Sequence, residues 1–233
     1  LAVDNNPYAA PRASVVENTA LALLPDFSPA YLRRLGWLSL ISLMASLVLL
    51  LMAVQQQTLP GAGRQLADWL GLALVLLGNY LLLCLKGFVE ARFAAAGLSW
   101  PVWLMVVGGL LLELLDFIFG EELFSGFNLP GISYFAVMAA YGLATLWLGV
   151  RLLQVENVYP SLRLLAWLDI AGGLLMASVV LVLLAIVPLL GSSLALMAVF
   201  FRGAQEQVSL AQTAQGSGLG SVPVSSQPRR SLF

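Results

Sequence analysis

The sequence contains no histidine and only one cysteine, Cys84. Without histidine, the chain lacks the side chain most often used for proton transfer near neutral pH and a common zinc ligand. A single cysteine excludes a disulfide within the chain, and a free thiol in an apolar run such as that around Cys84 usually serves packing. Because no nucleophile, base or metal set can be assembled, we predict no catalytic residues, no metal site and no cofactor. We expect that the protein is not an enzyme.

Charged residues are also scarce. They make up 10 % of the 233 residues, whereas ordinary soluble domains contain about 25 %. Hydrophobic residues make up 60 %, and the mean hydropathy is +0.92. Crossing a bilayer as a helix takes about 20 apolar residues, and the chain contains several such runs. The predicted fold class is therefore all-α, a polytopic transmembrane helical bundle.

We predict six spans with short connections. Ser28 and Pro29 are typical of a helix start, since serine caps the first turn and proline suits its first position. The tails at 1–30 and 204–233 are expected to be disordered, and no apolar signal-peptide core lies near the N-terminus. Between the tails, 31–203 forms the transmembrane domain, with spans at about 35–54, 69–85, 101–119, 133–150, 164–185 and 189–201.

The boundary between the last two spans is the hardest to place. Residues 170–201 carry no charge, and this stretch is too long for one ordinary span but slightly short for two. Pro188 and the Gly-Ser-Ser sequence at 191–193 favour a reversal in its second half. One long tilted helix is the alternative.

Basic residues alternate with the predicted spans. With the N-terminus inside, the inner segments contain every Lys and Arg of the sequence except Arg64. Because Lys and Arg are concentrated in cytoplasmic loops, we predict that both termini are cytoplasmic. A single last span would place Arg202, Arg229 and Arg230 outside, so this pattern favours two spans in that stretch.

The N-terminal segment Asn6-Pro7-Tyr8-Ala9-Ala10-Pro11 resembles the NPYxAP segment of assorted small bacterial inner-membrane proteins, many of them of unknown function. The resemblance is confined to this segment and implies a protein of the bacterial cytoplasmic (inner) membrane, without implying an activity. An ordinary proline-rich tail is the competing interpretation. We expect the lipid bilayer as the surroundings, other membrane proteins as candidate partners, and no nucleic acid.

Two carboxylates interrupt the apolar run at 110–122, which ends on Glu121 and Glu122. Glu113 and Asp116 are three residues apart and share a helix face. Charge within a bilayer is costly and commonly marks a functional position, so Glu113 and Asp116 form our candidate ion or proton site. With the predicted orientation, Asp116 lies nearer the outer surface than Glu113. Candidate hydrogen-bond partners at the depth of Glu113 are Ser46, Tyr141 and Ser178.

Other interpretations of the acidic residues stay open. Glu113 is also explained as a protonated side chain hydrogen-bonded between helices. In that interpretation Asp116, Glu121 and Glu122 are simply hydrated at the outer surface. A divalent cation held by all four carboxylates lacks support from any ligand-loop spacing. Asp169 can cap a helix, pair with Arg163 or line an inner vestibule, and the first two roles are favoured.

Two functions follow from this pattern. The first is a non-enzymatic accessory or scaffold component of a membrane complex, favoured because no inverted repeat and no intramembrane basic residue is visible. The alternative is a small proton- or cation-coupled transporter that uses Glu113. Small residues four apart, Thr145 with Gly149 and Gly173 with Ala177, permit close helix packing in either case.

Overall fold

The computed structural model describes residues 27–55, 61–120, 123 and 128–218. These residues form helices and connecting turns, without a strand. The six helices are α1 (Pro29–Val54), α2 (Gly61–Phe93), α3 (Ser99–Phe119), α4 (Leu129–Leu153), α5 (Pro160–Ala177) and α6 (Val182–Gly218). Each is long and apolar enough to cross a membrane, so the all-α, multi-pass prediction is confirmed.

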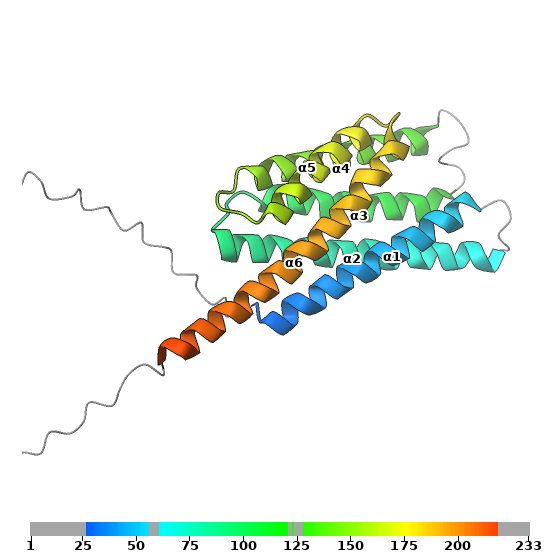
Figure 1. Ribbon diagram of the computed structural model, residues 1–233. Coiled ribbons are helices and arrows are strands. Elements are labelled where there is room, and N and C mark those ends of the chain that lie inside the picture. Colours follow the sequence, from blue (N-terminus) through cyan, green and yellow to red (C-terminus); the bar gives the residue numbers. More distant parts are fainter. Residues whose placement is uncertain (1–26, 56–60, 121–122, 124–127, 219–233) are drawn as a thin grey trace, which may run out of the picture.

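The helices pack as a closed ring in chain order. Each helix contacts the helices before and after it, and α6 returns to contact α1. Figure 1 shows that consecutive helices run in opposite directions and that α6, in yellow to orange, runs beside α1, is inclined to α2, α3, α4 and α5, and extends beyond them. The starts of α1, α3 and α5 therefore meet the ends of α2, α4 and α6 at one end of the bundle.

That end, which we call the basic end, gathers nearly all the positive charge of the described helices. Arg64 is the exception, because it lies near the start of α2 at the opposite end. The residues at the basic end are Arg33, Arg34, Lys86, Arg92, Arg151, Arg163 and Arg202.

Local sequence explains where two of the helices begin. Ser28 caps α1, and its hydroxyl accepts a hydrogen bond from the Tyr31 backbone N–H at 3.2 Å, as predicted. Asn128 caps α4 in the same way, with its side-chain oxygen 2.8 Å from the Gly131 nitrogen. A capping oxygen of this kind satisfies a backbone donor that the first turn leaves unpaired.

The last two helices form a hairpin rather than one long helix, but the turn is not where the sequence suggested. α5 ends at Ala177 and α6 begins at Val182, whereas Pro188 lies inside α6. The Ser178 hydroxyl stabilises the turn: it donates to the Leu175 carbonyl at 2.6 Å and accepts from the Leu181 N–H at 3.2 Å. Residues 182–185 therefore belong to α6 and not to the fifth span predicted at 164–185.

The sixth helix also continues well past the predicted span at 189–201. Residues 204–218, expected in a disordered tail, are helical, while 1–26 and 219–233 lie outside the described residues. Packing explains the extension, since Ala204 and Gln207 are buried. Gly203 lies against the Phe88 ring so closely that a Cβ there would approach it within 2.7 Å.

The hydrophobic core occupies the half of the bundle nearer the basic end. Leu32 of α1, Phe88 of α2, Leu162 of α5 and Phe200 of α6 are fully buried within it. The Phe88 and Phe200 rings meet edge to face, with centroids 6.4 Å apart. This half of the ring is therefore filled by side chains.

The backbones of α4 and α5 approach each other most closely at small residues. A Cβ at Gly173 would lie 2.5 Å from the Leu146 nitrogen and 2.6 Å from the Gly142 oxygen. A Cβ at Gly149 would lie 2.7 Å from the Ala166 oxygen. These contacts confirm that the small residues at 149 and 173 permit close helix packing.

Candidate functional site

A pocket of about 420 Å³ lies inside the ring, and all six helices contribute to its lining. Leu85, Met105, Leu148 and Leu165 line it toward the basic end, where they also belong to the packed core. Most of the lining is apolar, and no Lys or Arg of the described residues takes part. The polar side chains that line it are Ser46, Asn79, Glu113, Tyr141, Asp169, Ser192 and Ser193.

Glu113 lies on the pocket wall opposite Gly71 of α2. Its Oε1 is 3.3 Å from the position that a Cβ of Gly71 would take, so the absence of a side chain there makes room for the carboxylate. Glu113 has no hydrogen-bond or ion-pair partner within the described part of the chain. The structure therefore places Glu113 where a bound proton or cation can interact with it.

Asp116, the other member of the predicted pair, is exposed and does not line the pocket. Asp68 of α2 lies close enough to Glu113 and Asp116 for its charge to act on both. The sequence placed Asp68 in a loop, whereas α2 begins at Gly61 and includes it. The negative charge outside the pocket thus comes from two helices and not from α3 alone.

Asn79 and Tyr141 reach the pocket beside a pair of glycines in α3. The Tyr141 ring lies 3.2 Å from the Cβ position of Gly108, and Asn79 Oδ1 lies 3.7 Å from that of Gly109. Neither polar side-chain group has a hydrogen-bond partner among the residues that the structure describes. Both can therefore bind a molecule or water in the pocket. By depth alone, the sequence predicts Tyr141 near the level of Glu113 and Asn79 nearer the inner side.

Ser46 and Ser178, the other predicted partners of Glu113, differ in position. Ser46 lines the pocket, but its hydroxyl donates to the Ser42 carbonyl at 2.9 Å. Ser178 lies in the α5–α6 turn, where its hydroxyl bonds the backbone. The structure thus brings Ser46 and Tyr141 to the same pocket as Glu113 and places Ser178 away from it.

Asp169 is the second carboxylate of the pocket and is only 8 % exposed. Its Oδ1 accepts a hydrogen bond from the Ser192 hydroxyl of α6 at 2.7 Å. Its Oδ2 has no such partner in the described residues. The two roles that the sequence favoured do not apply, since Asp169 bonds Ser192 rather than Arg163 and lies too far into α5 to cap it. Of the roles considered, lining a vestibule is closest to the arrangement observed.

The remaining acidic residues give no metal centre in the part of the chain described. Glu121 and Glu122 lie outside the described residues. Within those residues, no three His, Cys, Asp or Glu side chains are grouped as ligands of a metal ion would be.

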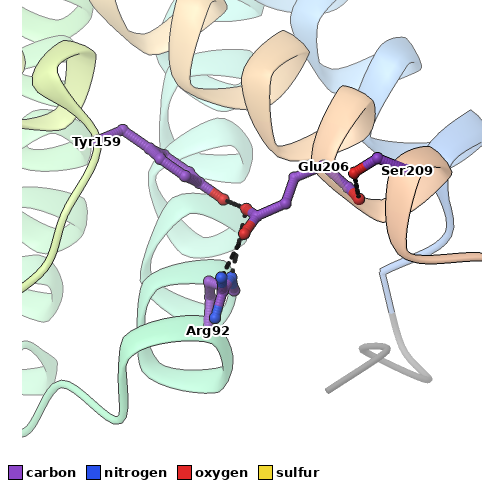
Figure 2. Close-up of polar contacts among 4 residues, drawn as sticks. All are labelled: Arg92, Tyr159, Glu206 and Ser209. Atoms are coloured by element: carbon purple, nitrogen blue, oxygen red, sulfur yellow. Dashed lines mark hydrogen bonds and ion pairs between the residues drawn. The ribbon is translucent and has the colours of Figure 1, made fainter. Parts of the chain in front are cut away.

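A second polar cluster joins three elements at the basic end (Figure 2). The Glu206 carboxylate of α6 lies between the Arg92 guanidinium of α2 and the Tyr159 hydroxyl at the start of α5. Arg92 Nε is 3.4 Å from Glu206 Oε2, and the Tyr159 hydroxyl donates to the same carboxylate. Burial, together with the hydrogen bond to Glu206, raises the pKa of Tyr159 to about 12.

Sequence reasoning gave no indication of this cluster. The charge pattern assigns Arg92 only to the basic residues of the inner segments, and Glu206 falls within the tail predicted at 204–233. The contact between residues 92 and 206 joins α2 and α6, which are not neighbours in the ring. Hydropathy carries no information about a contact of this kind. The cluster closes the basic end over the packed core, on the side away from Glu113.

No protein family, curated protein or solved structure matches the chain in comparisons of its sequence and fold.

Proposed function

We propose that the protein is a small proton- or cation-coupled transporter of the bacterial cytoplasmic membrane that uses Glu113. The observation that carries this proposal is the position of Glu113 in a pocket lined by all six helices. No basic side chain of the described residues lines that pocket, and none pairs with Glu113. An ionised carboxylate in apolar surroundings is costly, and binding a proton or a cation removes that cost.

An accessory or scaffold role, which the sequence favoured first, has less support. Its support is the set of large apolar side chains exposed around the ring, such as Trp37, Phe117 and Leu183. Any helix that faces lipid tails exposes side chains of this kind. The pocket, by contrast, is not needed for packing against a partner. The described lining offers carboxylates, an amide and hydroxyls, which are groups that can bind a proton, a cation or a polar part of a solute.

Reconstitution into liposomes tests this role of Glu113. We expect that Glu113→Gln lowers proton or monovalent-cation flux at least about tenfold, because the amide cannot ionise while its size is nearly unchanged. Flux is measured with a trapped pH-sensitive dye and with radiolabelled Na⁺ and K⁺ under imposed gradients. Glu156→Gln is the matched control, since it makes the same substitution at an exposed carboxylate of the α4–α5 turn, outside the pocket lining. Equal flux in wild type and Glu113→Gln would contradict the proposal.

The proposal also includes the orientation, with the basic end and both termini in the cytoplasm. The concentration of Lys and Arg at one end of the ring supports it. In a Cys84→Ser background, we expect a membrane-impermeant maleimide to label Val180→Cys in intact cells, because the α5–α6 turn lies opposite the basic end. We expect Glu156→Cys, in the α4–α5 turn, to react only after lysis. The reverse labelling pattern would show that the protein has the opposite orientation in the membrane.

A further inference from the structure

The shape and chemistry of the pocket restrict the kind of solute that it can bind. A volume of about 420 Å³ is within the range of small-molecule sites, roughly 300–1,000 Å³. Its walls include Leu49, Leu74 and Val75, so a solute that fills it must present apolar surface. Among the described residues, the acidic side chains that line the pocket are Glu113 and Asp169, and no basic side chain lines it. A solute complementary to this surface is apolar in its body and positively charged.

Asp169 is positioned to meet that charge. Its side chain is more than nine-tenths buried, it lines the pocket, and Ser192 holds its Oδ1 from the neighbouring helix. Its Oδ2 has no hydrogen-bond partner in the described residues. A buried carboxylate with one oxygen fixed and the other free is oriented to accept from, or pair with, a cation in the pocket.

Asn79 and Tyr141 add to the same surface. The Asn79 amide can accept or donate a hydrogen bond, and the face of an aromatic ring such as Tyr141 attracts an organic cation. Both side chains have polar groups without a partner among the described residues. Together with Asp169 they come from α2, α4 and α5, so the ring must close before these groups converge.

We propose that the solute is an organic monocation with an apolar body, of the ammonium class, and that Asp169 pairs with its charge. This inference rests on the proposed transport function and names the substrate class of the same pocket. Glu113 remains the coupling group, and a proton bound there balances the charge of one cation that leaves Asp169. A metal cation fits less well, because Ca²⁺ takes six to eight oxygen ligands and most of this lining is apolar.

Equilibrium binding to the full chain in phosphatidylcholine nanodiscs tests the inference. The probe is radiolabelled phenyltrimethylammonium, and its neutral isostere tert-butylbenzene is one competitor. We expect saturable binding that tert-butylbenzene and 100-fold excess Na⁺ leave in place. We expect Asp169→Asn to weaken binding at least about tenfold, and Glu156→Gln, at an exposed carboxylate outside the pocket lining, to change it less than about twofold.

Ser192→Ala keeps the inference testable if Asp169→Asn does not yield a monodisperse protein. This variant keeps the carboxylate and removes its hydrogen bond, so we expect binding to weaken about two- to fivefold. Unchanged binding in Asp169→Asn, no saturable binding in wild type, or displacement of the probe by Na⁺ would each overturn the inference. Flux that depends on Glu113, without probe binding, overturns the inference about the solute and leaves the transport proposal in place. Asp169-dependent binding without Glu113-dependent flux supports the cation site and overturns only the transport proposal.

Discussion

Replacing Gly173 with alanine is expected to destabilise the protein by about 2 kcal/mol, the middle of the range for overpacked sites. The added methyl group would lie 2.5 Å from the Leu146 nitrogen and 2.6 Å from the Gly142 oxygen. Both are backbone atoms, so no side chain can rotate away and α4 must separate from α5. For a chain of this size the loss corresponds to a fall of roughly 4–8 °C in melting temperature.

Gly78→Ala is the matched control for Gly173→Ala. Gly78 is also a glycine inside a helix, but a Cβ there would meet nothing within 4 Å. Both substitutions gain the helix propensity of alanine over glycine, about 1 kcal/mol, so their difference isolates the contact with α4. Thermal unfolding in detergent, followed by tryptophan fluorescence, gives the comparison. A melting temperature for Gly173→Ala equal to that of Gly78→Ala would refute this account of the α4–α5 interface.

Features of the fold that depend on local sequence could be predicted. The number of helices follows from the apolar runs, and the start of α1 follows from Ser28 and Pro29, because capping involves residues within one turn. The close approach at Gly149 and Gly173 follows from small residues four apart. In each case the residues that determine the structure are neighbours along the chain or along one helix.

The end of α5 could not be predicted because its turn carries no hydropathy signal. Val179, Val180 and Leu181 are apolar, whereas Pro188, which resembles a break, is accommodated inside α6. Proline is tolerated in membrane helices because neighbouring groups satisfy the backbone that it frees. The position predicted for Ser178 is wrong for the same reason. A fifth span that reaches residue 185 places Ser178 at the depth of Glu113, whereas Ser178 lies in the α5–α6 turn.

The sequence did not predict the pocket. It offered Ser46, Tyr141 and Ser178 as hydrogen-bond partners of Glu113, and none of them bonds to Glu113 in the structure. Glu113, Tyr141 and Ser46 were assigned to similar depths from their positions in the spans, and they do line one pocket. Depth alone did not reveal that Asp169 and Asn79 join them, because that requires the order of helices around the ring. Asp116 is a candidate site residue only because of its spacing to Glu113, and the structure shows it exposed and not among the residues that line the pocket. Sequence spacing places residues on a common face without showing what that face contacts.

The cluster at the basic end has an energetic role that sequence reasoning missed entirely. Glu206 joins the helical extension of α6, which the sequence predicts as a tail, to Arg92 of α2 and Tyr159 at the start of α5 (Figure 2). The side chains of Arg92 and Glu206 are 16 % and 20 % exposed. Ion pairs at the surface contribute about 0–1 kcal/mol, while removing one partner of a buried pair costs about 3–5 kcal/mol.

We therefore expect Glu206→Ala to destabilise the protein by about 2 kcal/mol, between the limits for exposed and buried ion pairs. In a double-mutant cycle with Arg92→Ala, the coupling energy should exceed about 1 kcal/mol, because the two residues are in direct contact. Lys86 and Glu90 are the matched control pair: they also form a salt bridge, at 2.9 Å, but four residues apart on one helix. Their cycle should give only about 0.3–0.5 kcal/mol, since breaking it separates no helices. Equal coupling energies for the two pairs, measured by thermal unfolding in the same detergent, would show that Glu206 does not hold α6 against α2.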